Sequence, residues 1–219
     1  MLLDLHVHSS ISPCSTLSLD HIVTHARAHG LDGVCITDHD SMASRLLLRE
    51  GMQDNGLLVL VGMEYTTAQG DFLLFGPFED LAPGLCAREL LTLVHDAGGA
   101  AVAAHPCRSN RPTAMELAAQ GLVHAVETLN GRNSEEENRL AQAWPGRFKL
   151  SAVGGSDAHT LPELGRSPTR FFTRIKSRAD LVRALRKGRC EPALRQGRLP
   201  LIRRALAAKP PRTACPSHP

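Results

Sequence analysis

Histidines and acidic residues at several points of this chain have the types and spacing needed to bind more than one divalent metal ion. His6 and His8 lie in an apolar strand pattern and face the same way, because side chains alternate along a strand. Two imidazoles on one face can bind one cation through their ring nitrogens. Asp4 projects from the same face of the strand and could accept the ring N–H of a histidine that binds metal through its other nitrogen. The pair alone is equally consistent with two buried structural histidines.

Other metal-binding side chains recur along the chain, and each has a plain structural alternative. Asp38 or Asp40 could cap a helix, as could Asp157, whereas Glu64 could be a surface carboxylate and His105 a core histidine. Taken as a set, the predicted metal ligands are His6, His8, Asp38, His39, Glu64, His105, Asp157 and His159. Cations bound by such side chains generate a nucleophile from water, so the set indicates a hydrolase.

Apolar strand segments alternate with helical segments. We expect strands at residues 2–7, 33–37, 57–61, 72–75, 100–104, 122–128, 150–153 and 171–175, and helices at 18–29, 42–55, 88–97, 113–120, 134–143 and 179–187. Buried strands separated by helices are typical of a parallel sheet covered on both faces. The candidate ligands follow the C-terminal ends of many predicted strands, which favours a closed α/β barrel over an open doubly wound sheet.

Composition limits the class of protein further. A chain of 219 residues with 42% hydrophobic residues suits one globular domain, and its apolar runs are too short to span a bilayer. The N-terminus opens on a strand pattern rather than a signal peptide, so we expect a cytoplasmic protein with no membrane anchor. The six cysteines form no CxxC pair, and we expect them to be reduced.

Positive charge is concentrated towards the C-terminus, although the formal net charge is only +3. We predict a domain over residues 1–194 and a basic, proline-containing tail over 195–219 that is poorly ordered. A basic tail could instead bind nucleic acid. No aromatic residue interleaves its charges to stack on bases, which favours the solvated tail.

The order of these motifs resembles the PHP family, the polymerase and histidinol phosphatase domains. HxH, DH, E, H and DxH follow one another from Asp4 to about Ala193. The resemblance implies a distorted, TIM-like (β/α)7 barrel with parallel strands, two or three divalent metals (zinc, manganese or iron) and phosphoester hydrolysis. It implies His6, His8, Glu64 and Asp157 at a first metal, Glu64 and His105 at a second, and His39 with His159 at a third.

Two positions depart from the family pattern. Where many members carry an Asp shortly after HxH, this chain has Ser12-Pro13-Cys14, so either Cys14 or Asp38 substitutes or the third metal site is weakened. Where many members carry a His before a strand-end glycine, this chain has Leu73. The second metal would then use water, substrate or another side chain, and we expect at least two metals.

Roles in catalysis follow from the same resemblance and from charge. His39 or His159 could protonate the leaving oxygen beside Asp157, and Arg108 and Arg132 could bind the substrate phosphate unless they are plain surface arginines. The leading hypothesis is a phosphoesterase for a phosphorylated small molecule or short nucleotide. The alternatives are a nuclease acting on longer nucleic acid and a non-catalytic, metal-binding regulatory barrel. The sequence indicates neither the substrate nor the oligomeric state.

Overall fold

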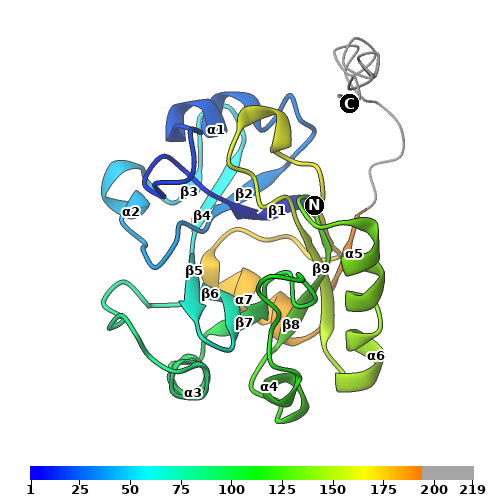
Figure 1. Cartoon of the computed structure of the whole chain (residues 1–219). Helices are drawn as coiled ribbons and strands as arrows, with labels where there is room; N and C mark the ends of the chain where they lie inside the picture. The colour runs from blue at the N-terminus through cyan, green and yellow to red at the C-terminus, as the bar shows by residue number, and fades with distance from the viewer. Residues whose placement is uncertain (194–219) are drawn as a thin grey trace, which may run out of the picture.

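Eleven short strands form two sheets in the computed structural model, which describes residues 1–193 (Figure 1). The first sheet has the order β11 (Cys190–Pro192), β10 (Thr169–Phe171), β1 (Leu2–Val7), β2 (Gly33–Ile36), β4 (Leu58–Val61) and β3 (Gly51–Met52). The second has the order β5 (Met63–Thr67), β6 (Gly70–Phe75), β7 (Ala100–Ala103), β8 (Ala125–Asn130) and β9 (Ser151–Gly155). The predicted tail at 195–219 lies outside the described residues.

Seven α-helices and one 3-10 helix pack around these sheets in the described range. They are α1 (Leu19–His25), α2 (Ser44–Leu47), α3 (Ala87–Asp96), α4 (Met115–Ala119), α5 (Glu135–Ala141), α6 (Trp144–Phe148), η1 (Leu161–Glu163) and α7 (Arg178–Arg186). Ser18, Ser134 and Ser177 cap α1, α5 and α7 by accepting backbone N–H groups, as serine does at helix N-termini. Figure 1 shows α5 and α6 stacked along β8 and β9.

The predicted α/β class is confirmed, but the prediction of parallel strands throughout is wrong. Parallel pairing joins β1 to β2, β2 to β4, β7 to β8 and β8 to β9. In contrast, β5, β6 and β7 pair antiparallel, as do β3, β10 and β11 with their neighbours. The turn between β5 and β6 is too short for the crossover that parallel strands need. Only isolated bridges, Val7 to Ala158 and His39 to Glu64, link strands across the two sheets, so no continuous ladder closes a barrel over residues 1–193.

The helix expected at residues 42–55 is also wrong. Within residues 42–55 the chain is helical only in α2, and it then forms the short edge strand β3 against β4. Gly51 adopts a φ of +117°, which lies far outside the helical region and ends any helix there. The strands β5 and β11 and the helix α6 were not expected, because each is short and lacks a clear periodic pattern.

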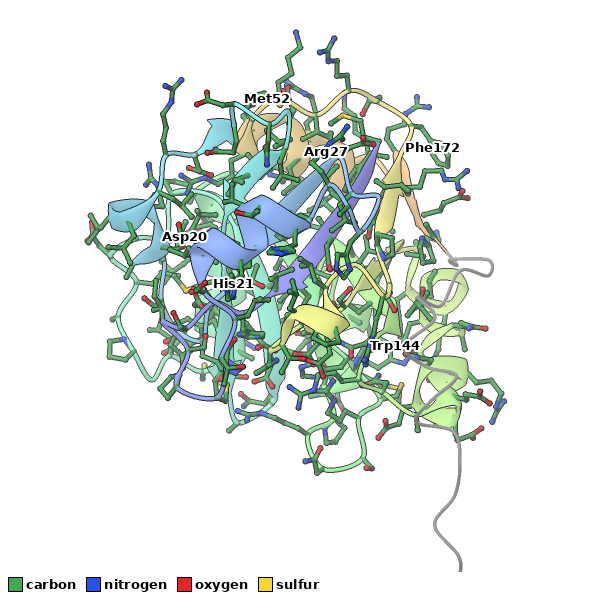
Figure 2. All side chains as sticks on the ribbon, turned by 90° about the horizontal axis from the view of Figure 1, so that it is seen from above. Asp20, His21, Arg27, Met52, Trp144 and Phe172 are labelled. Atoms are coloured by element: carbon green, nitrogen blue, oxygen red, sulfur yellow. The ribbon has the colours of Figure 1, made fainter. Side chains whose placement is uncertain are left out.

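Alternate residues of β6 pack into different parts of the core. Leu73 and Phe75 pack in the cluster that includes Leu3 and Leu5 of β1, whereas Phe72 packs with the apolar face of α3. Trp144 on α6, labelled in Figure 2, is 5% exposed and belongs to the same core cluster as Phe72.

The five cysteines among residues 1–193 form no disulfide, and no helix in that range is long and apolar enough to cross a membrane.

We expect His124 to make folding stability pH-dependent. Its Nδ1 accepts the Ala101 N–H at 3.2 Å, so this nitrogen must be unprotonated. Burial, with Arg186 and His95 nearby, lowers the pKa of His124 from 6.5 to about 4. As the pH falls, the unfolded chain therefore binds a proton at this histidine before the folded chain does. His124 contributes about 1 to 2 kcal/mol to folding stability after allowing for its partial exposure, and this contribution is lost as the pH falls from about 6.5 to about 4.

Urea unfolding of the wild type and a His124→Gln variant at pH 7.5 and pH 4.5 tests this expectation, since glutamine can accept the same N–H without titrating. The variant is expected to lose less stability than the wild type between the two pH values. Equal losses would contradict the assignment.

Candidate metal centre

Strand β1 delivers two histidines to the same point. His6 and His8 are both 0% exposed, and their Nε2 atoms lie 3.0 Å apart. The alternation of β1 gives them this common direction, as the sequence predicted. Two buried imidazole nitrogens at this separation cannot both be protonated without repulsion, whereas a shared cation suits them both.

Glu64 lies at the centre of the cluster. Its Oε2 is 3.3 Å from His6 Nε2, 3.2 Å from His8 Nε2 and 3.0 Å from His39 Nδ1. Its Oε1 is 2.9 Å from His105 Nε2. The bridge between His39 and Glu64 holds the start of β5 beside the end of β2, which brings this carboxylate inside. A carboxylate with histidines on both oxygens has the arrangement that bridges two cations.

The chain segment after β9 completes the cluster from the other side. Asp157 Oδ1 is 3.7 Å from His6 Nε2 and 3.5 Å from His8 Nε2. His159 follows two residues later, and its ring centroid is 4.3 Å from that of His8. Asp157 and His105 adopt positive φ values of +53° and +30°, which are unfavourable for residues other than glycine. Such strained conformations persist where the surrounding structure enforces them, often at functional sites.

Three groups of side chains have potential ligand atoms within 4.8 Å of one another among the described residues. The groups are His6, His8 and Asp157; His6, Glu64 and His105; and His8, His39 and His159. Nitrogen and carboxylate oxygen are the donors that zinc, manganese and iron accept. The side chains therefore fit divalent cations, and the structure brings together every predicted ligand except Asp38.

Opposite charges control protonation in this cluster. Burial favours neutral His6, but Glu127, Glu64 and Asp157 outweigh burial and raise the pKa of His6 well above its usual range. Burial likewise opposes the Glu64 charge, yet His6, His105 and His39 hold the pKa of Glu64 well below its usual range. Burial and the neighbouring His8 lower the pKa of His159. Cations would compete with the protons on these rings, since metal ligands must be deprotonated.

Two carboxylates near the ligands have other partners than the sequence suggested. Asp38 accepts hydrogen bonds from the Ser9 N–H and hydroxyl and from the Ser12 hydroxyl, at 2.6 to 2.7 Å. Its lone pairs therefore face the loop after β1 rather than the histidine rings. Asp4 accepts the Ser156 and Gly165 N–H groups at 2.9 Å instead of a histidine ring proton. Asp4 thus ties β1 to the loops around Asp157, and the expected tautomer role is wrong.

The two candidate phosphate-binding arginines both contact predicted metal ligands. Arg108 Nη2 donates to Asp157 Oδ2 at 2.7 Å and to Asn130 Oδ1 at 3.0 Å. Arg132 Nη1 lies 2.8 Å from His159 Nδ1. Cys14 is exposed and belongs to none of the three groups among the described residues.

Sequence reasoning missed the partner of the His6 ring. Glu127 on β8 is 0% exposed, and its Oε1 lies 2.9 Å from His6 Nδ1. Its Oε2 accepts the His105 N–H at 2.8 Å and the Asn130 amide at 3.0 Å. Glu127 therefore directs His6 Nε2 towards Glu64. Its place at the C-terminal end of the strand expected at 122–128, like that of the candidate ligands on other strands, was the signal that could have identified it.

We expect Glu127→Gln to lower metal affinity about 10- to 100-fold, the usual effect of losing the carboxylate that orients a ligating histidine. The amide keeps the shape of the side chain but lacks the charge that supports His6. Calorimetric titration with Mn²⁺ measures the change, with the exposed Glu135→Gln as control. Unchanged affinity in Glu127→Gln would show that this carboxylate does not orient a ligand.

Two protein-family profiles match this chain. The PHP domain profile matches residues 4–141, and the PHP-associated profile matches residues 135–190. The protein belongs to the PHP family, as the order of its motifs indicated.

Two sequence relatives come from Methanocaldococcus jannaschii. Uncharacterized protein MJ1587 is 28% identical over 113 residues, which cover 47% of this chain and 66% of that protein. Uncharacterized protein MJ0417 is 26% identical over 180 residues, which cover 78% of this chain and 70% of that protein. The chain thus matches about two thirds of the length of each relative.

Solved structures share the fold. PsfC from Pseudomonas syringae PB-5123 has a TM-score of 0.71 at 18% identity, covering 88% of this chain and 91% of PsfC. The lesion-specific endonuclease PfuEndoQ from Pyrococcus furiosus has a TM-score of 0.65 at 18% identity, covering 87% of this chain and 57% of the endonuclease. A protein from Bifidobacterium adolescentis described as a metal-dependent phosphoesterase has a TM-score of 0.61 at 19% identity, covering 74% of this chain and 88% of that protein.

Proposed function

We propose that this protein is a metal-dependent phosphoesterase that hydrolyses a phosphomonoester or a short nucleotide phosphoester. The observation that carries the proposal is the buried Glu64 carboxylate, which meets His6, His8 and His39 at one oxygen and His105 at the other. A carboxylate with histidines at both of its oxygens could hold two cations, as the donors of a two-metal hydrolase do. The metal-dependent phosphoesterase and the endonuclease that share the fold are consistent with this class.

In the proposed assignment, these side chains would hold two or three divalent cations (zinc, manganese or iron). His6, His8, Glu64 and Asp157 would hold the first, Glu64 and His105 the second, and His39 with His159 a third. Bound divalent cations would lower the pKa of a water molecule and neutralise phosphoryl oxygens. Asp38 takes a different role, since it fixes the loop after β1 through Ser9 and Ser12.

Partly exposed side chains beside the cluster would donate the proton and bind the phosphate oxygens. His39 has 34% of its side chain exposed and faces Glu64, so it could donate a proton to the leaving oxygen when it does not hold the third cation. Arg108 and Arg132 keep further guanidinium donors that could bind the phosphoryl group while they position Asp157 and His159.

Hydrolysis of a chromogenic phosphomonoester and a chromogenic phosphodiester, each with and without added Mn²⁺, tests the proposal. We expect Mn²⁺-dependent hydrolysis of the monoester. Cleavage of oligonucleotides that falls steeply with salt and disappears on removing residues 195–219 would favour the nuclease instead. Hydrolysis of none of these substrates by a metal-loaded protein would favour the regulatory barrel.

A further inference from the structure

The second cation of the proposed site has fewer protein donors than the first. Glu64 and His105 supply one oxygen and one nitrogen, 2.9 Å apart. Leu73, where a further ligand was expected, packs into the apolar core. A further donor from β6 to the second cation would therefore have to come from another residue on the same face of this strand.

Strand β6 brings a carboxylate to the same end of the sheet as the metal ligands. Asp71 is two residues before Leu73 and shares its face, since side chains alternate along a strand. Because β6 runs antiparallel to β7, its first residues lie beside the C-terminal end of β7 (Figure 1). The Asp71 carbonyl accepts the Ala104 N–H at 3.0 Å, next to His105.

The Asp71 side chain is buried and incompletely satisfied. It is 2% exposed, and its Oδ1 has no hydrogen-bond partner among the described residues. Its Oδ2 lies 3.9 Å from His105 Nε2, the same nitrogen that faces Glu64. Two donors that each lie about 2.1 Å from one cation are separated by about 3 to 4 Å. A cation beside His105 could therefore bind Glu64 and Asp71 together.

We propose that Asp71 is a ligand of the second cation, so that this site uses two carboxylates and one imidazole. The inference rests on the proposed metal site. Carboxylate-rich donor sets suit Mn²⁺ better than thiolate- or imidazole-rich sets do. The second site should accordingly prefer Mn²⁺ over Zn²⁺ more strongly than the first, where His6 and His8 both contribute.

Arg111 is the alternative partner of this carboxylate. Its Nε lies 2.7 Å from Asp71 Oδ2, and 45% of its side chain is exposed. An exposed arginine can swing away when a cation binds the carboxylate. If Asp71 served only to pair with Arg111, removing either side chain would change metal binding in the same way. If Asp71 is a ligand, only its own removal weakens the second cation.

Manganese binding by Asp71→Asn and Arg111→Ala provides the test, with the exposed Asp96→Asn as control. Calorimetry should show that Asp71→Asn loses the second equivalent or binds it at least about 10-fold more weakly. Arg111→Ala should retain the second equivalent at wild-type affinity or better, because it frees the carboxylate. Equal weakening in both variants, or none in Asp71→Asn, would overturn the inference.

A second measurement uses the wild type and does not depend on whether a variant folds. A crystal structure of the full chain loaded with Mn²⁺ should place an Asp71 oxygen at bonding distance from the cation beside His105. A cation bound there with Asp71 still paired to Arg111 would overturn the inference. Wild-type protein that binds two equivalents through Asp71 but hydrolyses no phosphoester would contradict the proposed function alone.

Discussion

Replacing Glu64 with glutamine is expected to reduce phosphoester hydrolysis by about 1,000-fold or more. The amide has nearly the same shape but removes the negative charge that meets four histidines at the centre of the site. Cations contribute several kcal/mol of charge stabilisation in such hydrolyses, and about 4 kcal/mol corresponds to about three powers of ten in rate. Steady-state kinetics at saturating Mn²⁺ on the chromogenic monoester would measure the loss.

The matched control for this experiment is Glu135→Gln on the exposed first turn of α5, which makes the same chemical change on the surface. It should keep wild-type activity. If Glu64→Gln retains activity within a few fold of the wild type, Glu64 does not bridge the cations, and the assignment of the first two metals fails.

The second large effect is expected at Gly155, at the end of β9. A Cβ added there would lie 2.0 Å from Glu127 Oε1 and 2.6 Å from His6 Cβ. Neither group can move without displacing the other, because their hydrogen bond directs the His6 ring. Gly155→Ala should therefore destabilise the fold by about 1 to 3 kcal/mol and weaken metal binding at the same time.

Thermal unfolding and manganese titration of Gly155→Ala measure both effects. Gly146→Ala on the exposed surface of α6 is the control, since an added Cβ there meets no atom within 4 Å. That substitution should be neutral or stabilising by up to about 1 kcal/mol, as alanine is the better helix former. A Gly155→Ala protein with wild-type stability and metal affinity would contradict the tight packing around His6.

Local patterns predicted the parts of the structure that depend on neighbouring residues. The alternation around His6 and His8 predicted their common direction, and the helices expected from residues 18 and 134 begin one residue later, as α1 and α5. The candidate ligands were recognisable because each belongs to a short motif in a characteristic order. In contrast, no strand was expected at β5, so its antiparallel hairpin with β6 was not predicted.

Features that depend on contacts between distant residues were not predicted. Asp38 looked like a ligand in sequence, but hydrogen bonds from Ser9 and Ser12 draw its carboxylate to a loop 26 and 29 residues earlier. Glu127 is 121 residues from the His6 ring that it supports. Only the fold shows that Asp38 anchors a loop and that Glu127, rather than Asp4, contacts the His6 ring.

The metal content of a His6→Ala variant tests the central claim most directly. His6 is a ligand of the first cation in the proposed assignment, and its Nε2 lies 3.3 Å from the Glu64 carboxylate that the first two sites share. Elemental analysis of the purified protein, together with the chromogenic assay, should show at least one metal equivalent fewer than in the wild type and no measurable hydrolysis. A His6→Ala protein that retains both its full metal content and its activity would contradict the account.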